Sequence, residues 1–198
     1  MCRKGEGGRM DDQLTAEERK ALLGLARATL QRGVCGEELP KLELETLTPN
    51  LKAPGAAFIT LTIGGELRGC IGALEPYQPL AWDVREHALA AALEDPRFPP
   101  VGPEELGRIQ IEISRLTFPK PLEYRDAQDL LEHLRPHVDG VILRDGFRRA
   151  TFLPQVWEKI PDKGEFLNHL CAKMGAAPDT WRRKHLEVQT YQVEEFRE

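Results

Sequence analysis

Apolar positions along the chain alternate between the spacing of a helix and the spacing of a strand. Thr15 and Glu18 have the spacing of a capping box, and the leucines that follow recur every three or four residues, which predicts a helix over 15–32. An Ala-rich stretch predicts a second helix over 80–94. Isoleucines that alternate with polar residues predict a half-buried strand over 108–117.

Two short glycine-containing turns predict β-hairpins. Gly64-Gly65 and Asp145-Gly146 each separate two strand-like runs, which is typical of a two-residue turn. The expected strand pairs are 56–63 with 66–71 and 141–144 with 147–153. Further helices are expected over 126–134, 154–160, 163–174 and 178–184, and a closing strand over 186–193. Because the strands arrive as hairpins rather than in β-α-β alternation, the sequence predicts an α+β fold with a mostly antiparallel sheet flanked by helices.

Composition and charge exclude several classes of protein. The chain has 198 residues, of which 41% are hydrophobic and 30% charged, and its net charge is −5 (27 Lys+Arg against 32 Asp+Glu). It is long enough for one domain with a substantial core. Its apolar runs are far shorter than the roughly 20 residues of a membrane span. The negative net charge argues against a general nucleic-acid-coating protein, while a local basic patch stays open.

The amino-terminal segment predicts a leader rather than a targeting signal. Residues 1–13 are rich in Gly and charge, so we expect a disordered leader followed by a domain over 14–198. Met1 to Arg9 contains no apolar signal core, which argues against secretion and favours the cytoplasm. Met1 and Met10 both stay open as the first translated residue.

The cysteine pattern argues against a metal or redox motif. The four cysteines contain no C-x-x-C pair, and the sequence has no phosphate-binding glycine motif. We therefore expect free thiols in a reducing compartment, no bound metal and no cofactor.

The segment Leu67-Arg-Gly-Cys-Ile-Gly72 is the most informative for chemistry. On a strand, Arg68 and Cys70 face the same way, and a guanidinium beside a thiol favours the reactive thiolate. Gly69 and Gly72 remove bulk on either side of Cys70, so we expect them to contact a substrate. Two interpretations stay open: Cys70 reacts with or contacts a ligand, or it is a small core residue and the glycines mark a bulge.

The segment Asp95-Pro-Arg-Phe-Pro-Pro100 predicts a stiff loop that carries opposite charges. Proline restricts its own backbone and that of the preceding residue, so the loop can hold Arg97 ready for an anionic group. Alternatively, Asp95 pairs with Arg97 and fixes the loop internally. The two interpretations are equally supported by the spacing.

Several segments in order resemble the AMMECR domain family, named after a human chromosomal-region syndrome. These segments are 67–72, 95–100, 111–114, 139–143, 152–157, 166–167 and 171–175, and the resemblance runs from about residue 15 to 196. It implies an intracellular α+β domain with a larger and a smaller lobe and a cleft lined by Cys70 and its neighbours. It also implies Memo-like and radical S-adenosylmethionine proteins as partners. Met174 departs from the family pattern, where a smaller residue is usual.

Two functional hypotheses follow. In the first, the chain is an enzyme or modifying factor: Cys70 is the nucleophile, Arg68 favours its thiolate or binds an anionic substrate, and Asp95 and Arg97 position the substrate. No general base for this reaction can be identified from the sequence. In the second, the chain is a binding module for a partner protein or a nucleic acid, and Cys70 is a packed residue of the cleft.

Overall fold

The computed structural model describes residues 13–198, and all but the last residue of the expected leader lies outside this range. The chain folds into two compact units, one formed by the residues up to Arg115 together with Glu194–Glu198, the other by Leu116–Val193. Helices and antiparallel strands are mixed in both, so the predicted α+β class is confirmed. Among the helices of residues 13–198, none combines the length and apolarity that crossing a membrane requires.

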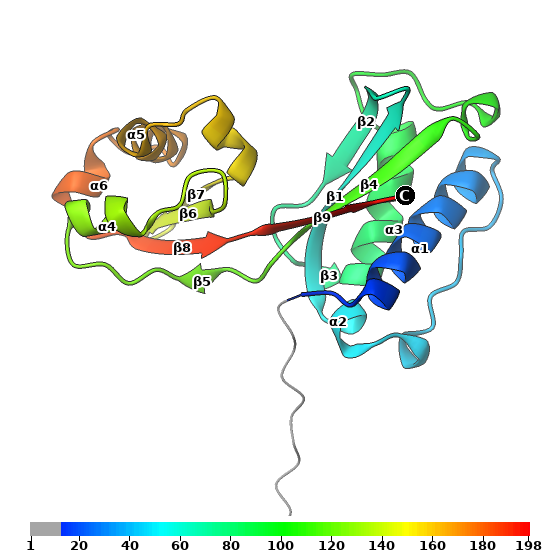
Figure 1. Cartoon of the computed structure of the whole chain (residues 1–198), viewed down its shortest axis with the longest axis horizontal. Helices are drawn as coiled ribbons and strands as arrows, with labels where there is room; N and C mark the ends of the chain where they lie inside the picture. The colour runs from blue at the N-terminus through cyan, green and yellow to red at the C-terminus, as the bar shows by residue number, and fades with distance from the viewer. Residues whose placement is uncertain (1–12) are drawn as a thin grey trace, which may run out of the picture. The chain divides into compact units, whose positions relative to one another are not determined.

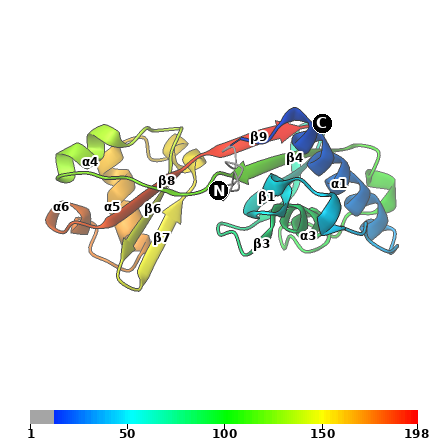
Figure 2. The same ribbon diagram turned by 90° about the horizontal axis from the view of Figure 1, so that it is seen from below.

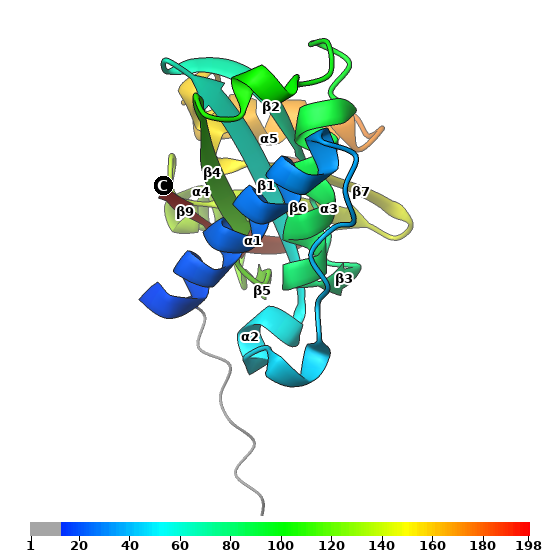
Figure 3. The same ribbon diagram turned by 90° about the vertical axis from the view of Figure 1, so that its right-hand side faces the viewer.

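The first unit is a sheet with two long helices against it. Its strands have the order β2-β1-β4-β9, and β3 pairs with β1. The elements are α1 (Ala16–Val34), η1 (Leu44–Thr46), α2 (Pro49–Lys52), β1 (Pro54–Ile63), β2 (Glu66–Gly72), β3 (Gln78–Pro79), α3 (Leu80–Leu93), η2 (Pro103–Glu105), β4 (Ile109–Leu116) and β9 (Val193–Arg197). Figures 1 and 3 show α1 and α3 side by side on one face of this sheet.

Strand alternation decides which face of the sheet is buried. Ile59 and Leu61 of β1 and Ile111 of β4 are fully buried in the same core as the apolar residues of α1 and α3. The residues between them, such as Thr60 and Gln110, therefore point to the opposite, helix-free face. This unit thus presents one polar sheet face, on which the candidate chemistry lies.

The second unit is a four-stranded sheet with the order β5-β8-β6-β7. Its elements are β5 (Lys120–Pro121), α4 (Ala127–His133), β6 (Gly140–Asp145), β7 (Arg148–Phe152), η3 (Pro154–Glu158), α5 (Lys163–Lys173), α6 (Thr180–Arg183) and β8 (Glu187–Tyr191). Figure 2 shows α5 beside the strands β6 and β7. The Trp157 ring stacks on Phe166 with centroids 3.5 Å apart, which anchors this separate core.

The predicted helices and both hairpins are confirmed, with three corrections. The helix expected over 154–160 is the short 3-10 helix η3. Asp145 pairs with Arg148, so the second turn is Gly146-Phe147, one residue later than expected. Gly146 has a positive φ of 61°, which places glycine at the first central position of a primed turn. The expected closing strand is in fact two strands, β8 and β9, which join different sheets.

The edge strand β2 approaches helix α3 most closely at Gly69. A β-carbon at this position would lie 2.0 Å from the carbonyl oxygen of Ala91, a backbone atom that cannot move aside alone. Only glycine therefore allows this separation between strand and helix. Gly24, in the middle of α1, offers a matched comparison, because a β-carbon added there would meet no heavy atom within 4 Å.

We expect Gly69→Ala to lower the free energy of unfolding by about 1–3 kcal/mol or more, because the added methyl group forces β2 away from α3. Gly24→Ala should raise it by about 0.5–1 kcal/mol, since alanine favours the helix and nothing is displaced. Urea unfolding of the two variants and the wild type measures both changes. Equal stability of Gly69→Ala and the wild type would contradict the close approach.

Candidate functional site

Cys70 lies on β2 at the edge of the first sheet, opposite Thr60 of β1. Its side chain is half-buried, and the Thr60 hydroxyl donates a hydrogen bond to its sulfur at 3.4 Å. The thiol is therefore reachable and has a polar neighbour, which places it outside the apolar core.

Asp95 fixes the backbone of Cys70 from the outer side of the sheet. The carboxylate follows α3 directly, is 4% exposed, and accepts the Cys70 N–H at 2.8 Å through Oδ2. It also accepts the Arg97 N–H and Nε at 3.1 and 2.9 Å through Oδ1. The Arg97 guanidinium, and to a smaller extent the Cys70 N–H, holds the pKa of Asp95 well below its usual range.

Arg97 completes this arrangement. Its Nη2 donates to the Cys70 carbonyl at 3.1 Å and to Asp95 Oδ2 at 2.6 Å, while about half of the side chain stays exposed. Hydrogen bonds to Asp95 raise the pKa of Arg97, and interaction with Cys70 adds to this. The internal Asp95–Arg97 pair that the sequence left as one of two alternatives is present, and it also places a cation beside Cys70.

The structure places Arg68 differently from the sequence-based expectation. Its Nε and Nη2 donate to the Glu105 carboxylate at 2.7 and 2.9 Å, and Nη2 also meets the Pro100 carbonyl at 3.4 Å. Arg68 is the extra residue on β2 where the register with β1 shifts. Its charge is thus balanced by Glu105, and Arg97 is the guanidinium that contacts Cys70. A catalytic role of Arg68 stays a prediction.

Packing against neighbouring backbone explains why glycine occupies positions 69 and 72. Gly69 faces Ala91 of α3, and a β-carbon on Gly72 would lie 2.4 Å from the Ala57 carbonyl oxygen on β1. Bulk is excluded at both positions by neighbouring backbone. Contact of Gly69 or Gly72 with a substrate stays a prediction.

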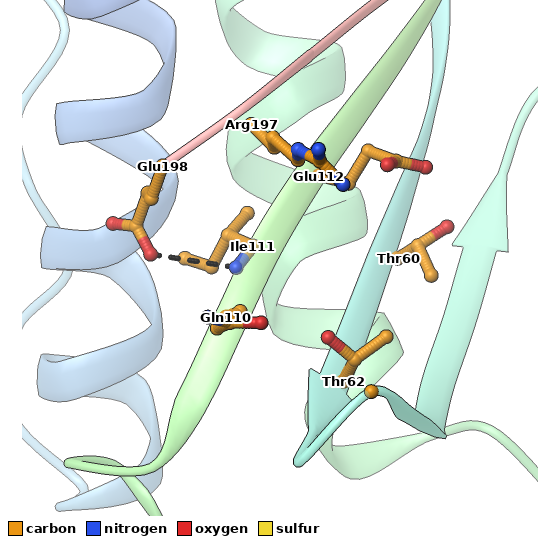
Figure 4. Close-up of a pocket in the computed structure, with 8 residues that line it drawn as sticks. Thr60, Thr62, Gln110, Ile111, Glu112, Arg197 and Glu198 are labelled. Atoms are coloured by element: carbon orange, nitrogen blue, oxygen red, sulfur yellow. Dashed lines mark hydrogen bonds between the residues drawn. The ribbon is translucent and has the colours of Figure 1, made fainter.

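A polar pocket of about 370 Å³ lies on the same sheet face. It is lined by Thr60, Thr62, Gly65, Gln110, Ile111, Glu112, Arg197 and Glu198, from strands β1, β4 and β9 and the turn after β1 (Figure 4). Thr60 belongs to both the pocket wall and the hydrogen bond to Cys70, so the pocket adjoins the thiol.

The other described cysteines lie in different surroundings. Cys35 is exposed at the end of α1, and Cys171 is completely buried, which raises the pKa of its thiol. Within residues 13–198, no three His, Cys, Asp or Glu side chains form a group that could hold a metal ion. Of the three described thiols, Cys70 alone adjoins the polar pocket.

Sequence reasoning missed Thr60, Glu105 and Glu112. The alternation of β4 indicates that Glu112 points away from the core, but not which strand lies beside it. Glu105 lies 37 residues from Arg68, with no periodicity that connects them. Only the strand register and the loop path bring these groups to Cys70 and Arg68.

The Arg68–Glu105 ion pair predicts that the stability of the folded protein falls over a defined range of acidic pH. Arg68, followed by the Gly102 N–H, lowers the pKa of Glu105 from its ordinary 4.5 to about 2. Because the folded-state pKa is depressed, this stabilisation is present above pH 4.5 and is lost as the pH falls towards 2. We expect the stability difference between wild type and Glu105→Gln to shrink by about 1–2 kcal/mol over that window, since both partners are only slightly exposed.

Urea unfolding at a series of pH values measures this difference. Glu104→Gln is the matched control, because Glu104 is exposed and next in the chain, and its difference from wild type should stay flat. A pH-independent Glu105→Gln difference would contradict the ion pair.

The chain is similar to known proteins over most of its length. The AMMECR1 family model matches residues 23–196. A protein of Methanothermobacter thermautotrophicus is 38% identical over 190 residues, covering 93% of this chain and 96% of the relative. One of Methanopyrus kandleri is 38% identical over 197 residues, covering 96% and 92%. The crystal structure of an uncharacterized protein from Pyrococcus horikoshii is similar, with a TM-score of 0.72, 31% identity and 93% of each chain covered. The chain belongs to the AMMECR1 family.

Proposed function

We propose that this AMMECR1-family protein is a cytoplasmic enzyme or modifying factor that uses the Cys70 thiol as a nucleophile. The observation that supports this best is the position of the sulfur: it adjoins a polar pocket, accepts the Thr60 hydroxyl and lies on a residue whose backbone Asp95 and Arg97 hold. A core cysteine needs none of these contacts.

The contacts around Cys70 suit nucleophilic catalysis. The thiolate is the reactive form of cysteine, and both a hydroxyl donor and a nearby cation stabilise its charge. At Cys70 the Thr60 hydroxyl donates to the sulfur, and the Arg97 guanidinium donates to the carbonyl oxygen of the same residue. Because Asp95 and Arg97 occupy the N–H and carbonyl of Cys70, the strand edge is fixed and little rearrangement is needed when a substrate arrives.

The proposed step is attack of the Cys70 sulfur on an electrophilic carbon, such as an acyl carbon. A new S–C bond forms, the bond from that carbon to its leaving group breaks, and the leaving group departs with the electron pair. The thiol proton passes to solvent. Water or a second substrate then takes up the acyl group and restores the thiol.

The family resemblance supports Memo-like and radical S-adenosylmethionine proteins as proposed partners that supply or receive such a group. The alternative, a binding module for a protein or nucleic acid, uses the same surface without a covalent intermediate. Thiol dependence therefore separates the two hypotheses.

We expect p-nitrophenyl acetate, a simple acyl donor, to acetylate Cys70 in the folded protein at least about tenfold faster than Cys35. Cys35 is the matched control because its thiol is exposed at the end of α1, outside the group formed by Thr60, Asp95 and Arg97. Peptide mass spectrometry locates the adducts, and release of p-nitrophenolate gives the rate. Cys70→Ser should remove the fast phase, and Cys35→Ser should not.

The two arginines provide a second comparison. Arg97→Gln should slow acetylation of Cys70 several-fold, whereas Arg68→Gln should change it little, because Glu105 already balances the charge of Arg68. Acetylation of Cys70 no faster than that of Cys35, or only on unfolding, would overturn the nucleophile hypothesis and favour the binding module.

A further inference from the structure

The pocket beside Cys70 contains two opposite charges that no residue of the described chain neutralises. Glu112 from β4 and Arg197 from β9 both line it, and within residues 13–198 neither takes part in a hydrogen bond or ion pair. Gln110 and Thr62, also in the lining, likewise have no side-chain partner within that range.

Other charged side chains near the pocket, in contrast, have ion-pair partners within the protein. Arg97 is paired with Asp95, and Glu198, which also lines the pocket, is paired with Arg27 and accepts the Ile111 N–H. The charges of Arg97 and Glu198 are therefore neutralised by partners within the protein. The two charges that stay available are of opposite sign and line the same cavity.

We infer that this pocket binds a small zwitterionic molecule of the amino-acid type. Arg197 suits a carboxylate, which a guanidinium meets through two parallel hydrogen bonds, and Glu112 suits an ammonium group. The hydroxyls of Thr60 and Thr62 and the amide of Gln110 add neutral hydrogen-bonding groups that fix orientation (Figure 4).

The size of the cavity agrees with this ligand class. A volume of about 370 Å³ lies at the lower end of the range for small-molecule sites, which suits an amino acid or a dipeptide. The polar lining argues against an apolar ligand, whose burial would leave hydroxyl, amide and charged groups without partners.

The inference rests on the proposed function in one respect, the link to Cys70. Thr60 lines the pocket and donates to the Cys70 sulfur, so a single side chain separates the pocket that holds the zwitterion from the thiol. The bound molecule is then a candidate for the second substrate of the proposed reaction, because an amino group can take up the acyl group from Cys70.

The experiment is chemical-shift mapping of isotope-labelled protein with a panel of free α-amino acids and glycylglycine. We expect at least one to bind with a dissociation constant of about 1 mM or tighter and to shift the signals of β1, β4 and β9. The N-acetyl form of the amino acid that binds lacks the ammonium group, and its amide form lacks the carboxylate. Each of these two forms should bind at least about tenfold more weakly than the unmodified amino acid.

Matched protein variants identify which side chain meets which charge. Glu112→Gln should abolish the preference over the N-acetyl form while keeping the preference over the amide, and Arg197→Gln should do the reverse. The double exchange Glu112→Arg with Arg197→Glu retains one charge of each sign and should lose binding of the original ligand if orientation matters.

Iodoacetamide labelling then tests the link to the thiol. The bound ligand should slow labelling of Cys70 several-fold and leave Cys35 unchanged. Failure of every zwitterion to bind, or equal binding of the blocked forms, overturns the inference without affecting acetylation of Cys70. Binding without protection of Cys70 upholds the ligand class but contradicts its link to the thiol.

Discussion

The close approach of β2 to α3 at Gly69 determines where every other group of the site can be. Because no β-carbon intervenes, the last turn of α3 lies directly against the edge strand, with the Ala91 carbonyl over Gly69. The helix ends at Leu93, so the next residues emerge beside the strand edge. Asp95 then reaches the Cys70 N–H without a long connection. A bulkier residue in place of Gly69 would move this loop and all of its contacts.

Asp95 resolves two energetic problems at once. An edge strand exposes unpaired N–H and carbonyl groups, which favour unwanted pairing with other chains, and a buried carboxylate is costly unless several donors satisfy it. Here the strand N–H is one of those donors and Arg97 provides the others, while Arg97 also occupies the Cys70 carbonyl. The loop that protects the sheet edge is therefore the same loop that holds a cation beside Cys70, so the proposed chemistry and the stability of the sheet edge depend on the same hydrogen bonds.

Local features of this architecture could be predicted from the sequence, and non-local ones could not. The capping box at Thr15 and the Asp95–Arg97 pair involve residues three and two positions apart, so spacing alone indicates them. Alternation puts Arg68 and Cys70 on one face and so predicts that they interact, but a register shift and a carboxylate 37 residues away decide the partner of Arg68. The pocket depends on which strands lie side by side, and β9 enters the first sheet from the far end of the chain, which no periodicity encodes.

Packing explains most of the Leu-Arg-Gly-Cys-Ile-Gly string but leaves its sulfur unexplained. Arg68 is used in an ion pair, the two glycines are required by neighbouring backbone, and Ile71 packs against the core. The hydrogen bonds from Cys70 to Asp95 and Arg97 use only its backbone atoms, so they do not require a thiol at this position. The sulfur accepts a hydrogen bond from the Thr60 hydroxyl, on the wall of a polar pocket. The thiol is therefore the part of this string that the contacts described above do not explain, which supports the proposal that Cys70 takes part in chemistry.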